Sequence, residues 1–258
     1  MLGFQSNPLV VRLTGKRSWP SLRAACWLAF GLGLIGLALT SAVLLNARDA
    51  IGPLTFLPFS LIAFSAFVPP IVALIAATLT VRDTHSESYE LLTATDISDT
   101  AIVQGYVFAA LYKLRLLLAM TMGAIPAIVV SVFDLVMRDR AALCPFHVSS
   151  GSACEPPPVT LGLVWLMIVI GLWGLNGAAA ALGVNWALRW QSEGAAVTFA
   201  TVVMFMLSLL AAGFWLAIYL PATTVPLPTW LVAFVWMYSP YAAAIGIMQN
   251  GERWTRRQ

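Results

Sequence analysis

Residues 82–100 read Arg-Asp-Thr-His-Ser-Glu-Ser-Tyr-Glu-Leu-Leu-Thr-Ala-Thr-Asp-Ile-Ser-Asp-Thr and form the longest polar island between the strongly apolar runs of this chain. Five of the eleven acidic residues lie in it. Asp83, Glu87 and Glu90 are spaced i, i+4 and i+7, so a helix would carry all three on one face. The apolar side chains would lie away from the centre of that face: Tyr89, Leu91 and Leu92. Such a segment favours docking of another protein or contact with a bilayer surface, and a solvated loop without a partner is the alternative.

The composition around this island is that of a membrane protein. Of the 258 residues, 60% are hydrophobic and 10% are charged, against roughly 25% charged in soluble domains. No polar segment is long enough to form a soluble core of its own. We therefore predict an all-α, polytopic protein with a single transmembrane domain over residues 1–258. The net charge of +3 carries no nucleic-acid signal.

Six apolar runs are long enough to cross a bilayer. They cover residues 22–45, 54–81, 116–136, 159–188, 195–220 and 230–248. Residues 101–112 are either a surface helix before the third span or the start of one long tilted helix. Residues 1–21 are predicted to form an interfacial segment in which Leu9, Val10 and Leu13 face the bilayer. Residues 137–158 form the longest loop outside the island.

The orientation follows from the positive-inside rule. With six spans, both termini and the island share one side, and that side holds eleven of the fourteen Lys and Arg residues. The other side holds Arg48, Arg138 and Arg140. We therefore expect cytoplasmic termini, a cytoplasmic island over 82–100 and an extracytoplasmic loop over 137–158.

Small and polar residues inside the spans predict tight helix packing. Gly31, Gly33 and Gly36 lie in the first span, and the fourth span holds three further glycines: Gly171, Gly174 and Gly177. Asn176 and Asn185 are expected to make interhelical hydrogen bonds, with substrate contact as the alternative. Pro69 and Pro70 predict a kink in the second span, with a ligand site at the freed backbone carbonyls as the alternative.

Motifs for catalysis and for nucleotide binding are absent from the sequence. No Gly-x-x-x-x-Gly-Lys-Ser/Thr, Gly-x-Ser-x-Gly or His-Glu-x-x-His is present. His85 and His147 fall on opposite sides of the membrane in the predicted topology. The spans hold almost no ionisable residues, which argues against a proton-coupled transporter, an ion pump or a channel with charged rings. We expect no enzyme activity, no catalytic residue, no resident metal and no cofactor in this chain.

Cys144 and Cys154 both fall in the extracytoplasmic loop. A disulfide between them is the candidate pairing in an oxidising compartment. Two free thiols, or a metal site with His147 between them, are the alternatives.

The island and its surroundings resemble the cytoplasmic coupling segment of ABC-2-type transporter permeases. In that family an acidic and basic cluster ends a span, a run with Glu-Leu-Leu follows, and Thr-Pro-Leu-Ser and Ile-Val-x-Gly-Lys lead into the next span. The counterparts here are residues 82–88, then 89–95 with Glu90-Leu91-Leu92 and Thr95, then 96–98 and 102–105. The opening Asn-Pro-Leu-Val-Val-Arg at 7–12 and the Ser-Pro-Tyr-Ala at 239–242 are also similar to the family pattern. Four positions depart from it, because Glu87 replaces Gly, Ser88 replaces Thr, Asp96 replaces Pro and Tyr106 replaces Lys.

The resemblance implies a permease subunit of an exporter in the cell membrane, the inner or plasma membrane of a prokaryote. Two such subunits, identical or paralogous, would pair among membrane lipids, and each would lay its coupling helix in a groove of a separate P-loop ATPase subunit that binds ATP. The implied contact residues are Asp83, Glu87, Tyr89, Glu90, Leu91, Leu92 and Thr95. These departures favour an alternative, a structural or assembly subunit that keeps the fold, does not transport and scaffolds a larger membrane complex.

Overall fold

The described part of the chain is almost entirely helical in a computed structural model. It comprises residues 8–14, 21–46, 53–86, 97–138, 158–190, 192–219, 235 and 238–249. The helices are α1 (Pro8–Thr14), α2 (Leu22–Asn46), α3 (Pro53–Thr84), α5 (Asp99–Lys113), α6 (Arg115–Arg138), α8 (Pro158–Arg189) and α9 (Glu193–Tyr219). Residues 238–249 add a further helical segment. The all-α prediction is confirmed for these residues.

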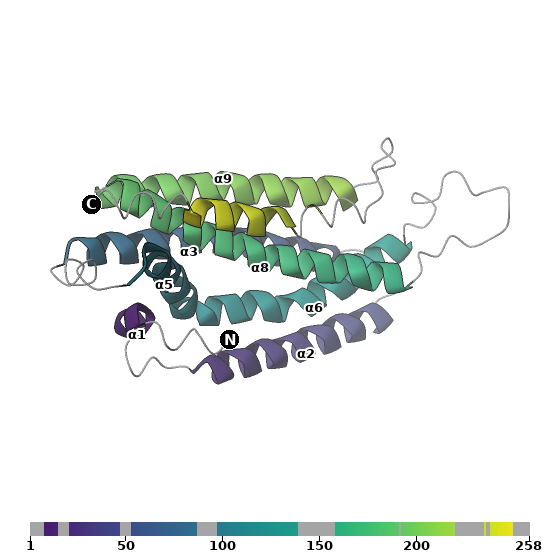
Figure 1. Ribbon diagram of the computed structural model, residues 1–258. Helices are drawn as coiled ribbons and strands as arrows, with labels where there is room; N and C mark the ends of the chain where they lie inside the picture. Colours follow the sequence, from purple (N-terminus) through teal and green to yellow (C-terminus); the bar gives the residue numbers. More distant parts are fainter. Residues whose placement is uncertain are drawn as a thin grey trace.

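The long helices lie side by side in one bundle with α3 in contact with most of the others (Figure 1). α3 packs against α5, α6, α8 and α9, whereas α2 packs against α6. The buried face of α3 carries Val68, Val72, Ala76 and Thr80, which recur every four residues and so lie on one stripe of the helix. Because the stripe is made of small side chains, α8 and α9 can approach α3 closely.

Glycine makes the closest of these approaches possible. A Cβ atom added at Gly183 of α8 would lie 2.4 Å from the carbonyl oxygen of Ala73 on α3. In α2, Cβ atoms at Gly33 and Gly36 would lie 3.3 Å from Pro126 Cγ and 3.2 Å from Ala127 Cβ of α6. The predicted packing role of these two glycines in α2 is confirmed. The prediction is wrong for Gly31, where nothing lies within 4 Å of an added Cβ.

The glycines of the fourth span also differ in how closely a neighbouring helix approaches them. A Cβ at Gly174 would lie 2.6 Å from the Tyr241 ring of segment 238–249, whereas one at Gly177 would meet nothing within 4 Å. The sequence pattern therefore identified the helix that packs closely, but Gly183, at the tightest contact of α8, was not among the residues it singled out.

Several helices have the length and composition of membrane spans. Leu22–Ala42, Phe64–Thr84 and Glu193–Leu210 each meet this description among the described residues. The pair Asp99–Lys113 and Arg115–Ile128 adds a fourth if it is counted as one bent span. α3 has 32 residues, which makes it about 48 Å long at 1.5 Å per residue. It therefore exceeds the roughly 30 Å hydrocarbon core and can carry its polar end beyond the lipid tails.

The chain turns sharply between α5 and α6. The two helices are bent by 66°, and the break is at Leu114, whose N–H reaches back to Ala110 O and Tyr112 O. The alternative of one long tilted helix from residue 101 is therefore wrong. Arg115 stabilises the corner, because its Nη1 donates to Tyr112 O at 2.7 Å and its guanidinium lies 4.1 Å from the Tyr112 ring centroid. By contrast, α3 continues as one helix through Pro69 and Pro70.

Arg115→Met is expected to lower the free energy of unfolding by about 1.5–3 kcal/mol, the usual contribution of a hydrogen bond to a charged group. The Arg115 side chain is buried, so its loss also leaves the end of α5 without its charged partner. Thermal unfolding in mild detergent measures the change. Lys113→Met is the matched control, since Lys113 is exposed. Equal effects of the two substitutions would show that the corner does not depend on Arg115.

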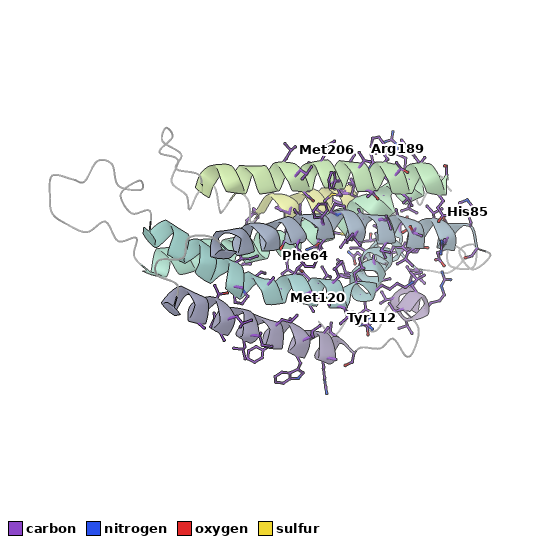
Figure 2. The ribbon with its side chains drawn as sticks, turned by 180° about the vertical axis from the view of Figure 1, so that it is seen from behind. Phe64, His85, Tyr112, Met120, Arg189 and Met206 are labelled. Atoms are coloured by element: carbon purple, nitrogen blue, oxygen red, sulfur yellow. The ribbon has the colours of Figure 1, made fainter. Side chains whose placement is uncertain are left out.

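Charge is distributed unevenly between the two ends of the bundle. The start of α2, the ends of α3 and α8 and the start of α9 lie at the end where α1 and α5 also lie (Figure 1). Arg12, Arg23, Arg82 and Arg189 belong to these elements, whereas Arg138 closes α6 at the opposite end. Figure 2 shows His85, Tyr112 and Arg189 toward the first end, with Phe64, Met120 and Met206 further along the bundle.

Candidate functional site

Three side chains from three helices meet where α3 ends, and we call them the helix-end junction: Arg12 of α1, Asp83 of α3 and Tyr106 of α5. Arg12 Nη2 forms an ion pair with Asp83 Oδ2. The Tyr106 hydroxyl donates to the same oxygen at 2.6 Å. The Asp83 side chain is 11% exposed and Tyr106 is fully buried. Charge-assisted hydrogen bonds in such a partly buried setting are stronger than surface ion pairs.

The junction holds α1 against the bundle together with apolar contacts. Leu9 is 1% exposed and belongs to the main hydrophobic core, and Val10 is also buried. The expectation that Leu9 and Val10 face the bilayer is therefore wrong. The reason is that α1 packs against α5 (Figure 1), so these side chains are buried against protein instead of lipid.

The end of α3 is closed by the polar residues that follow it. Thr84 Oγ1 donates to Val81 O at 2.9 Å, His85 Nδ1 lies 2.8 Å from the same oxygen, and Ser86 Oγ donates to Asp83 O at 2.6 Å. These contacts satisfy carbonyls that a helix end leaves open. Because the chain leaves the helix at residues 85 and 86, Asp83 does not share one continuous helix with Glu87 and Glu90.

The start of α5 is capped by polar side chains that accept from, or lie near, its free N–H groups. Ser98 is the N-cap, with its side chain accepting from Ala101 N at 3.3 Å, and Asp99 adds a negative charge in the first turn. Both ends of the segment 87–96 are thus attached to well-packed helices. Its predicted contact residues lie outside the described residues: Glu87, Tyr89, Glu90, Leu91, Leu92 and Thr95.

Of the predicted contact residues, Asp83 is the one that the structure describes. Its carboxylate already binds Arg12 and Tyr106, so within this chain it acts between helices. Sequence reasoning missed both partners. No local pattern pointed to either partner, because Arg12 and Tyr106 are 71 and 23 residues away from Asp83 in the sequence.

A second ion pair joins neighbouring helices at the same end. Arg82 Nε lies 3.4 Å from Glu193 Oε1, and the two side chains are 73% and 50% exposed. An ion pair this exposed to solvent contributes little to the stability of the fold, roughly 0–1 kcal/mol. Beneath it, Trp186, Trp190 and Phe199 pack their rings 4.4–5.2 Å apart between α8 and α9.

No cluster of three or more His, Cys, Asp or Glu side chains in the described ranges is arranged to hold an ion. Cys144, Cys154 and His147 lie outside those ranges, so the disulfide stays a prediction.

Comparison of the chain with models of protein families, with curated proteins and with solved structures finds no match.

Proposed function

We propose that this chain is the permease subunit of an ABC-2-type exporter. In this proposal it spans the cell membrane six times with cytoplasmic termini, pairs with a second permease subunit and docks residues 87–96 on a separate ATPase. The observation that carries the proposal is the attachment of this segment at both ends, through the capped end of α3 and the Ser98-capped start of α5.

The attachment matters because an ATPase can move the spans only through a stiff connection. On one side of the segment, Asp83 ties α3 to α1 and α5. On the other side, α5 packs against α3 and α8. A displacement imposed on residues 87–96 would therefore act on the helices at the centre of the bundle. The excess of Arg at this end supports a cytoplasmic location.

Purification from the native membrane in mild detergent tests the proposal. A P-loop ATPase in stoichiometric amount is the expected companion. Companions that are membrane subunits without an ATPase would overturn the proposal and favour the scaffold alternative.

Leu92→Asp is expected to reduce recovery of the ATPase roughly tenfold or more, because a charge placed in an apolar groove removes a central anchor. The variant should still insert in the membrane at the wild-type level. Thr100→Asp is the control, since it adds the same charge at an exposed position in the first turn of α5, where a helix tolerates it. Normal recovery with Leu92→Asp would exclude Leu92 from the contact.

A further inference from the structure

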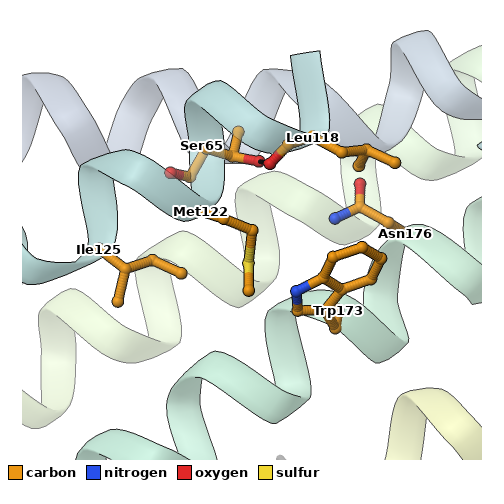
Figure 3. Close-up of a pocket in the computed structure, with 7 residues that line it drawn as sticks. Ser65, Leu118, Met122, Ile125, Trp173 and Asn176 are labelled. Carbon is orange, nitrogen blue, oxygen red and sulfur yellow. Dashed lines mark hydrogen bonds between the residues drawn. The ribbon is translucent and has the colours of Figure 1, made fainter. Parts of the chain in front are cut away.

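A small pocket lies between α3, α6 and α8 in the middle of the bundle. Its polar lining residues are Ser65, Thr121 and Asn176, one from each helix, and each is 8% exposed. Leu118, Met122 and Trp173 contribute apolar walls. In Figure 3 the Asn176 amide lies beside the Trp173 ring, with Met122 facing them from α6.

The pocket is far from both ends of α3 and α8. Ser65 lies near the middle of α3 and Asn176 near the middle of α8. At 1.5 Å per residue, more than about 15 Å of helix separates each of them from either end. Polar groups at this depth have no bulk water to bind and are costly unless hydrogen-bonding partners reach them.

The polar lining can bind an uncharged group. Thr121 Oγ1 donates its proton to Leu118 O at 2.8 Å, so it can offer an incoming hydroxyl only its lone pairs. The Asn176 amide has both donors and an acceptor. Since no ionisable side chain is among the lining residues, a charged group would enter without a counter-charge at high cost. The pocket therefore favours a neutral hydroxyl or amide.

The shape of the pocket limits how much of a ligand enters. About 300 Å³ is free of protein atoms, part of it open to the outside of the bundle, and the enclosed part has room for about one water-sized group. Trp173, which lines the pocket, is 40% exposed and so also reaches the surface of the bundle. A ligand would therefore place one polar group inside and leave its apolar body along Trp173, among the lipid tails.

We propose that Ser65, Thr121 and Asn176 form a binding site for the hydroxyl or amide of an uncharged amphipathic molecule. The site goes beyond the proposed coupling to an ATPase and needs no partner subunit.

Photolabelling of the purified chain in phosphatidylcholine nanodiscs tests the site. The probe is a long-chain alcohol with a diazirine next to its hydroxyl, and the matched probes are the hydrocarbon without the hydroxyl and the carboxylic acid. We expect the alcohol to label the α6 and α8 peptides that hold Met122 and Trp173, and excess dodecanol to compete. Absence of this labelling would mean that the pocket takes water only and would overturn the proposal, as would equal labelling by the hydrocarbon or stronger labelling by the acid.

Two variants locate the polar contacts. Asn176→Leu and the isosteric Thr121→Val should each reduce labelling by the alcohol roughly three- to tenfold, as expected for the loss of one hydrogen bond. Thr201→Val is the control, because Thr201 bonds its own helix at Val197 O and does not line the pocket. If the alcohol labelled both pocket variants as strongly as the wild type, the result would contradict the proposal. Because Thr121→Val keeps the volume of the side chain, it provides the test even if Asn176→Leu fails to fold.

Discussion

Gly183→Ala is expected to lower the free energy of unfolding by about 3 kcal/mol, at the upper end of the usual cost of overpacking a core. The added methyl group would lie 2.4 Å from the Ala73 carbonyl oxygen and 3.0 Å from Ala76 Cβ. Since the first of these atoms is backbone, no side chain can rotate away, and α3 and α8 must separate. Thermal unfolding in detergent, or steric trapping in a bilayer, measures the loss.

Gly177→Ala, in the same helix, controls for the change in helix propensity. Nothing lies within 4 Å of a Cβ atom at Gly177, and alanine is favoured over glycine inside a helix by about 1 kcal/mol. This variant should match the wild type or exceed it in stability. If Gly183→Ala behaved like Gly177→Ala, the close contact between α3 and α8 would not exist.

Asp83→Ala is expected to lower the free energy of unfolding by about 3 kcal/mol and to release α1 from the bundle. It removes the partner of Arg12 and leaves the buried Tyr106 hydroxyl without its acceptor, and both losses are expensive in a partly buried site. Trypsin should then cleave at Arg12 faster than in the wild type. In a double-mutant cycle, the variant that carries both Arg12→Ala and Asp83→Ala should lose less free energy of unfolding than the sum of the losses in the two single variants.

Glu193→Ala is the matched control, because it breaks a pair of the same chemistry in an exposed setting. Glu193→Ala should change the free energy of unfolding by no more than about 0.5 kcal/mol. It should leave the rate of trypsin cleavage at Arg12 unchanged. Equal effects of Asp83→Ala and Glu193→Ala would show that burial at the helix-end junction contributes nothing. If the coupling proposal holds, Arg12→Ala and Asp83→Ala should both weaken the link between the ATPase and the spans, although Arg12 lies outside the docking segment.

Much of the architecture follows from local patterns. Apolar runs of sufficient length predict helices in a membrane, and Leu22–Ala42, Phe64–Thr84 and Glu193–Leu210 have the predicted character. The polar residues Thr84, His85 and Ser86 end α3, and Ser98 starts α5, through contacts that span three or four residues. Hydropathy and capping can be predicted because the interacting groups are neighbours in the sequence.

The helix-end junction and the pocket could not be predicted in this way. Arg12 and Asp83 are 71 residues apart, and Asp83 and Tyr106 are 23 apart. Ser65, Thr121 and Asn176 converge from three helices. Which side chains meet across such separations depends on how each helix is rotated about its axis and how closely it approaches its neighbour. For the same reason two glycines of α8 differ in the bundle, although only Gly177 was singled out from the sequence: Gly183 faces the backbone of α3, and Gly177 faces open space.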